Sequence, residues 1–103
     1  MDLPIDIDRA ALAALCEKYG IEQLELFGSV LREDFGPDSD VDVLVRFREG
    51  ESPGLDEYLD IQEGLEALFG RAVDVLNRRV IEGSKNPYRK RSILESARVL
   101  FAA

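Results

Sequence analysis

Residues 40–47 constrain the fold more than any other segment of the sequence. From Val41 to Phe47 every second side chain is apolar, and a period of two is typical of a β-strand with one buried face. The opposite face begins with two acids, Asp40 and Asp42. We therefore expect a sheet in which one face of this strand is covered and the other face presents carboxylates at the start of the strand.

Helical and strand-like periods alternate on both sides of this strand. We expect one domain over residues 1–103, with an α/β (α+β) fold: a small sheet of about three strands flanked by helices. Asp6 or Asp8 can cap the first helix, and Ser52 can cap the helix after the strand, with Pro53 at its first position. The expected elements are a helix ending at residue 19, a strand at 21–27, one or two helical turns at 30–35, a turn at 36–39, a helix ending at 69, a strand at 72–76, an irregular stretch at 77–87 and a final helix at 88–101.

The composition excludes several kinds of chemistry. The chain has no histidine and a single cysteine, Cys16, which excludes the usual serine-hydrolase triads, zinc fingers, haem ligation and thiol–imidazole catalysis. Cys16 has no partner for an internal disulfide, and the first residues lack the pattern of a signal peptide, so we expect a reducing, cytoplasmic setting. No uncharged apolar run approaches the ~18 residues of a membrane-spanning helix, so we expect no membrane partner.

Charge is distributed unevenly along the chain. The net charge of −8, from 13 basic and 21 acidic residues, argues against nucleic acid as the main partner. Residues 71–103 nevertheless carry eight basic and three acidic side chains. This basic end either meets an anionic ligand or an acidic partner, or it only solvates its own surface.

Three acids are candidates for a metal site. Asp40 and Asp42 leave the same face of the predicted strand, although taken alone they also fit an ordinary solvent-facing edge. Asp74, between Val73 and Val75 in the other β-rich segment, can bring a third carboxylate beside them. Three such carboxylates repel one another unless cations lie between them, and oxygen-only ligands favour Mg²⁺, with Mn²⁺ as the alternative.

Gly28-Ser29, at the end of the strand at 21–27, is a candidate phosphate cradle. A glycine there lets the backbone approach a ligand closely, and the following N–H groups with the Ser29 hydroxyl can bind an anion. A Gly-Ser pair is also a common turn. Arg32 can contact the same phosphates or pair with Asp34 or Asp38 on the surface.

Gly28-Ser29, ten intervening residues, Asp40-Val41-Asp42 and the downstream Asp74 together resemble the signature of the nucleotidyltransferase superfamily related to DNA polymerase beta. The stretches at 26–29 and 37–45 are closer still to the minimal nucleotidyltransferases of prokaryotes, and the resemblance covers about residues 8–100. It implies a nucleotidyltransferase-like fold with a small mixed sheet.

The resemblance also implies a reaction. Two metal ions held by Asp40, Asp42 and Asp74 would position ATP, while Gly28 and Ser29 would hold its β- and γ-phosphates and AMP would pass to an acceptor hydroxyl. Asp74 would serve the acceptor side.

One departure from the minimal nucleotidyltransferases follows Gly28-Ser29. Members commonly have Ala-Arg-Gly one residue after the Gly-Ser pair, whereas this chain has Leu31-Arg32-Glu33. The exchange of glycine for Glu33 bears on rate or nucleotide choice, because the three carboxylates and the Gly-Ser pair are retained.

The acceptor implied by the resemblance is a protein. Minimal nucleotidyltransferases are typically paired with a small helical HEPN-type toxin and act as antitoxins that adenylylate a tyrosine of the toxin. Two alternatives stay open: an antitoxin that neutralises its partner by binding alone, and an enzyme that modifies a small molecule such as an aminoglycoside.

Overall fold

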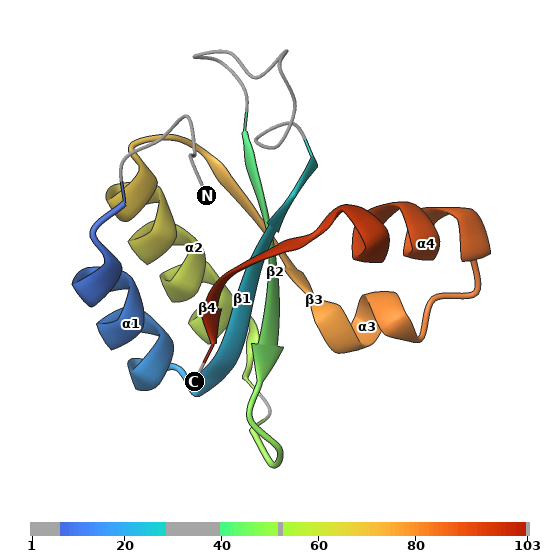
Figure 1. The fold of residues 1–103 in the computed structure, drawn as a ribbon. Helices are drawn as coiled ribbons and strands as arrows, with labels where there is room; N and C mark the ends of the chain where they lie inside the picture. Colours follow the sequence, from blue (N-terminus) through green and yellow to red (C-terminus); the bar gives the residue numbers. More distant parts are fainter. Residues whose placement is uncertain (1–6, 29–39, 52, 103) are drawn as a thin grey trace.

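A computed structural model describes residues 7–28, 40–51 and 53–102 of the chain. In this part the chain forms a mixed sheet with the strand order β3-β2-β1-β4, in which β2 and β3 are parallel and the other neighbours are antiparallel (Figure 1). The strands are β1 (Ile21–Phe27), β2 (Val41–Phe47), β3 (Val73–Asn77) and β4 (Arg98–Ala102). The helices are α1 (Arg9–Lys18), α2 (Leu55–Phe69), α3 (Arg78–Glu82) and α4 (Pro87–Ser96). None of these helices combines the length and the apolar character that crossing a membrane requires.

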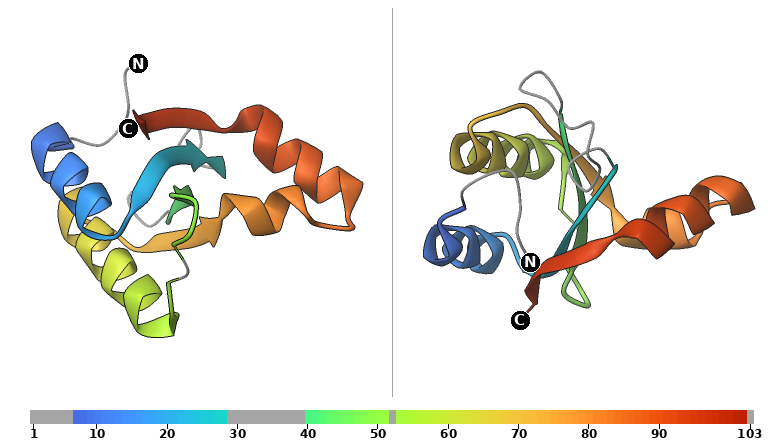
Figure 2. Two further views of the ribbon diagram at one scale, coloured as in Figure 1. Left: turned by 90° about the horizontal axis from the view of Figure 1, so that it is seen from below. Right: turned by 45° about the horizontal axis from the view of Figure 1, so that its top comes forward.

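Helices lie on both faces of the sheet (Figure 2). The larger core forms where α1 and α2 cover the face that carries the alternate valines of β2, Val41 to Val45, all of them buried. A smaller cluster on the opposite face joins Phe27 and Leu44 to Ile81 of α3, with part of α4 packed against it. The prediction that one face of β2 is covered and that the other carries the acids is therefore confirmed. The face with the acids is itself partly covered, because Leu44 is also buried.

The last third of the chain differs from the prediction. The expected helix over 88–101 is wrong in its second half: α4 ends at Ser96, Ala97 is extended, and β4 pairs with β1 through Leu24↔Phe101 and Leu26↔Arg98. The apolar spacing at the end of the chain fits a helix as well as a strand, and pairing with β1 decides between them. The expected irregular stretch at 77–87 contains α3, which Asn77 caps by accepting a hydrogen bond from the N–H of Arg79 at 2.9 Å.

Two helix starts were also predicted. Asp8 caps α1, because its Oδ1 accepts a hydrogen bond from the N–H of Ala11 at 3.1 Å. The start of α2 was predicted too early: Gly54 is its N-cap, and the N–H of Tyr58 closes the first turn onto the Gly54 carbonyl, so Pro53 lies before the helix. Asp6, Ser52 and the short elements expected at 30–39 lie outside the described residues.

Candidate active site

Two of the predicted acids lie side by side at one end of the sheet. Asp42 of β2 and Asp74 of β3 are register partners in the parallel pair. Neighbouring strands are about 4.8 Å apart, so the two side chains leave the same face close together. Asp42 is half-buried and Asp74 is exposed. The same face carries Leu44 and Leu76 two residues farther along, so the carboxylates border the apolar cluster beneath α3 and α4.

The third acid, Asp40, is exposed and directly precedes β2. Within residues 7–28, 40–51 and 53–102, no three acidic or cysteine side chains are gathered closely enough to hold a metal ion together. The structure thus pairs Asp42 with Asp74 and leaves Asp40 next to them at the start of the strand. Paired carboxylates are the oxygen donors that Mg²⁺ takes in proteins, so the pair fits such an ion by its chemistry.

Gly28 lies directly beside this pair. It follows Phe27, the register partner of Asp42, and its φ of +75° is in the left-handed region. A Cβ atom at residue 28 would lie under 3.0 Å from Oδ2 of Asp42 and 3.2 Å from its Cγ. Glycine is therefore required twice: by the backbone conformation and by the space that the Asp42 carboxylate occupies. Ser29 and Arg32, the other predicted phosphate ligands, lie outside the described residues, as does Glu33.

The strand that carries Asp74 is held in place by α2. β3 lies at the edge of the sheet, and both backbone polar groups of Val73 bond to α2 side chains. Nε2 of Gln62 donates to the Val73 carbonyl at 3.0 Å, and Oε2 of Glu66 accepts from the Val73 N–H at 3.1 Å. These two contacts fix the backbone one residue before Asp74. Gln62 and Glu66 were not predicted as part of the site. Their only signal in the sequence is that two polar side chains four residues apart border the buried stripe of a helix.

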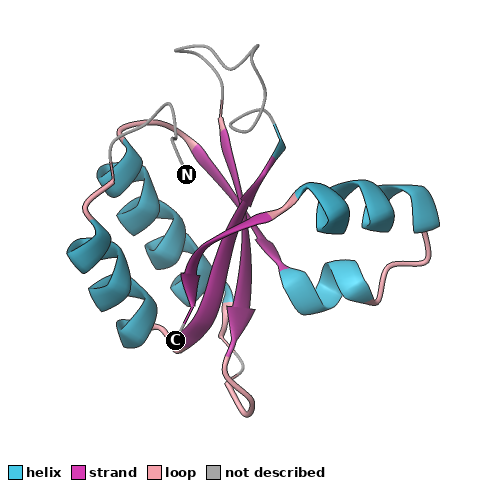
Figure 3. Cartoon of the chain, viewed as in Figure 1, coloured by secondary structure: helices cyan, strands magenta, loops and turns pink. Residues whose placement is uncertain are grey.

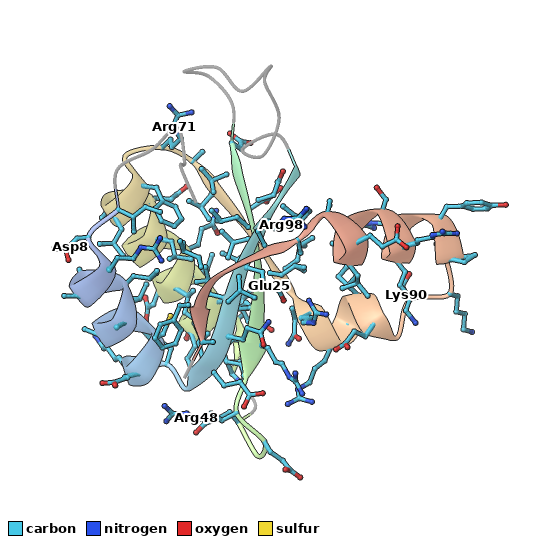
Figure 4. All side chains as sticks on the ribbon, viewed as in Figure 1. Asp8, Glu25, Arg48, Arg71, Lys90 and Arg98 are labelled. Atoms are coloured by element: carbon cyan, nitrogen blue, oxygen red, sulfur yellow. The ribbon has the colours of Figure 1, made fainter. Side chains whose placement is uncertain are left out.

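An ion pair fastens α3 to the same face of the sheet. Glu25 of β1, labelled in Figure 4, is buried, with 5% of its surface exposed, and it accepts a hydrogen bond from Nη1 of Arg78 in α3. Arg79 adds a hydrogen bond to the Phe47 carbonyl at 3.1 Å. These contacts hold the start of α3 beside the strands, so α3 and α4 form a wall next to the carboxylates. The pair was not predicted, because its partners are 53 positions apart.

Comparison with known proteins agrees with this geometry. Residues 9–100 match the nucleotidyltransferase domain family. A relative named "Putative protein adenylyltransferase MJ1379", from Methanocaldococcus jannaschii, is 40% identical over 81 residues, which are 79% of this chain and 78% of that protein. The family assignment includes β2, β3 and all three candidate acids.

Solved structures share the fold. One described as "Structure of putative minimal nucleotidyltransferase" aligns with a TM-score of 0.65 and 33% identity over 87% of this chain and 86% of that one. A complex of tri-AMPylated Shewanella oneidensis HEPN toxin with an MNT antitoxin aligns with a TM-score of 0.60 and 14% identity over 92% of this chain and 70% of that one, a likeness of fold alone. The chain therefore belongs to the nucleotidyltransferase domain family, as an enzyme of the minimal nucleotidyltransferase type.

Proposed function

We propose that this chain is an antitoxin that transfers AMP from ATP to a tyrosine hydroxyl of a HEPN-type toxin. The observation that carries the proposal is the register pair Asp42 and Asp74 beside Gly28, at one end of a sheet whose chain belongs to the nucleotidyltransferase family. The relative named as a protein adenylyltransferase supports a protein acceptor. The AMPylated toxin bound to an MNT antitoxin supports the class of partner.

In the proposed reaction the acceptor oxygen attacks the α-phosphorus of ATP. The new P–O bond forms while the bond from the α-phosphorus to the bridging oxygen breaks, and pyrophosphate leaves. Asp74, exposed at the edge strand, faces the side from which an acceptor can enter, and its carboxylate takes the hydroxyl proton or passes it to water. Gly28, with Ser29, binds the phosphates on the leaving side.

Asp42 and Asp74, together with Asp40, would hold the divalent ions that this chemistry uses. Bound Mg²⁺ would neutralise the phosphate charge and lower the pKa of the acceptor hydroxyl. The half-buried Asp42 lies between Gly28 and Asp74, so it is the carboxylate placed to contact both sides of the reaction. Its position beside Gly28 also explains why a larger residue at position 28 would disturb the centre of the site.

The experiment measures intact masses. This chain is incubated with ATP, Mg²⁺ and the purified product of the adjacent gene, which we expect to be a HEPN-type protein. We expect the partner to gain the mass of one or more adenylyl groups, with peptide mapping to tyrosine, and Asp42→Asn to abolish the gain. Glu63→Gln on the exposed side of α2 is the control and should leave the gain intact.

Two outcomes would replace the proposal. If Asp42→Asn neutralises the partner as well as the native chain does, without any change in mass, the antitoxin acts by binding alone. If AMP appears on an aminoglycoside and on no protein, the enzyme modifies a small molecule.

A further inference from the structure

The α3–α4 hairpin, residues 78–96, projects away from the sheet (Figures 1 and 3). Its base is held by the Glu25–Arg78 pair and by the small apolar cluster around Ile81. The loop that joins the two helices lies at the end farthest from the strands (Figure 1). None of the ten residues of α4 is buried. A helix that contributes so little to the core is free to present its surface to another molecule.

The hairpin differs from the rest of the chain in charge. Residues 78–96 contain six basic and two acidic side chains, whereas the remainder contains seven basic and 19 acidic ones. Three of its basic residues are engaged in ion pairs within the chain: Arg78 with Glu25, Arg79 with Glu22, and Arg91 with Glu95. These contacts leave the distal part of the hairpin as the place where positive charge is not neutralised.

Lys85 lies in the distal loop, and Arg89 and the half-buried Lys90 lie in the first turn of α4. Among the described residues, Lys85, Arg89 and Lys90 have no ion-pair partner (Figure 4 labels Lys90). Tyr88, between them in the sequence, is 86% exposed on the first turn of α4. We name these four residues the tip patch. Tyrosine and arginine are the residue types that most often dominate the energy of protein interfaces.

We propose that the tip patch docks an acidic surface of the protein acceptor. The inference rests on the proposed function, because it assigns the acceptor's binding site. Unneutralised positive charge around an exposed tyrosine fits a protein surface with carboxylates, and such complementarity speeds encounter and fixes orientation. A nucleic acid fits less well, because the remainder of the chain would repel a polyanion with its excess of acids.

The base of the hairpin lies on the same sheet face as the candidate active site. α3 packs on Leu44 and Phe27, on the sheet face that carries Asp42 and Asp74. A protein that docks on the tip patch and extends along the hairpin toward its base would reach the face of the sheet with the two carboxylates. Docking would raise the local concentration of the acceptor hydroxyl at the site, so it would act on the acceptor and not on ATP.

The test compares charge reversals of equal size in the full chain. Binding of the purified product of the adjacent gene, which we expect to be a HEPN-type protein, is measured at low and high salt. Lys85→Glu/Arg89→Glu should slow association by about tenfold or more and flatten its salt dependence. Lys18→Glu/Arg48→Glu, which changes the net charge equally at exposed positions outside the hairpin, should stay within about threefold of the native chain.

A second variant and a second readout separate this inference from the proposed function. Tyr88→Ala should weaken binding by about tenfold without a change in the melting temperature, because the side chain is exposed. In AMP transfer, the Lys85→Glu/Arg89→Glu variant should raise KM for the protein acceptor and leave KM for ATP unchanged. Asp42→Asn should do the reverse of the tip variants: it should dock normally and transfer nothing.

Several results would overturn the docking site. Unchanged binding and acceptor KM in both tip variants would do so while leaving AMP transfer in place. A reduced self-association of this chain, or a reduced binding to a single-stranded oligonucleotide, with no effect on the protein acceptor would assign the patch to another partner. Docking of the native chain that both tip variants weaken, without any AMP transfer, would support the patch and refute the proposed function. No docking by the native chain would refute both.

Discussion

Replacing Gly28 by alanine tests whether Gly28 and the Asp42 carboxylate are packed against each other. An alanine at a φ of +75° costs about 1–2 kcal/mol, and the smaller entropy of the unfolded alanine chain returns about 0.4–1 kcal/mol of that. The new Cβ also collides with the Asp42 carboxylate, and overpacking of this kind costs about 1–3 kcal/mol more. We therefore expect Gly28→Ala to lower the free energy of unfolding by about 1–5 kcal/mol.

The chain offers a matched control for the backbone term. Gly70, the αL residue that ends α2, has a φ of +72°, and a Cβ there would meet nothing within 4 Å. Gly70→Ala should therefore cost only the conformational part, about 1 kcal/mol. Urea denaturation followed by circular dichroism gives both values. Gly28→Ala should lower the rate of AMP transfer by about 10², because it displaces the Asp42 carboxylate, whereas Gly70→Ala should keep nearly all activity.

A double-mutant cycle isolates the collision. Asp42→Ala removes the carboxylate that the new Cβ would meet, so Gly28→Ala should cost about 1–3 kcal/mol less in that background than in the native chain. If the cost is the same in both backgrounds within about 0.3 kcal/mol, the Asp42 carboxylate does not occupy the space beside Gly28 that the structure assigns to it.

Three further predictions concern other parts of the chain. Glu66→Gln keeps an acceptor for the Val73 N–H and should retain activity. Gln62→Glu puts a carboxylate against the Val73 carbonyl and should lower the rate of AMP transfer at least about tenfold. A higher Mg²⁺ concentration needed for half-maximal activity would indicate that Asp74 has moved. Asp74→Asn should leave ATP binding, measured by calorimetry, within a few-fold and lower transfer by about 10², and equal losses in both would contradict its acceptor-side role. Burial raises the pKa of Cys16 to about 12 from its usual 9.0, so the thiol loses its proton at a lower pH in the unfolded chain than in the native one. Above pH 9 the free energy of unfolding of the native chain should therefore fall, relative to that of Cys16→Ala, by up to about 1.4 kcal/mol per pH unit. Parallel pH profiles of the two free energies would refute this.

The sequence predicts the centre of the fold well, because apolar side chains at every second position of β2 are typical of a strand with one buried face. It predicted that Asp74 can lie beside Asp40 and Asp42 if the two strands pair, and the parallel register of β2 and β3 confirms this for Asp42. It also placed Gly28 at the end of β1. What it could not show is that Gly28 and Asp42 touch, because that contact depends on how the two strands pair.

Three of the failures share one cause, which is tertiary pairing. Residues 98–102 have an apolar spacing that suits a helix, and only the hydrogen bonds to β1 make them a strand. The buried Glu25 looks like an exposed strand residue until Arg78 is placed beside it. The contacts of Gln62 and Glu66 with Val73 are likewise visible only once β3 lies at the edge of the sheet.

The most direct test of the account is which phosphate of ATP labels the acceptor. The native chain is incubated with Mg²⁺, the HEPN-type protein and ATP that carries ³²P at either the α- or the γ-position. Because the proposed reaction attacks the α-phosphorus beside Asp42 and Asp74 and expels the other two phosphates, only α-labelled ATP should label the protein. Asp42→Asn should remove that label. Labelling from γ-labelled ATP, or labelling that survives Asp42→Asn, would contradict nucleotidyl transfer at this site.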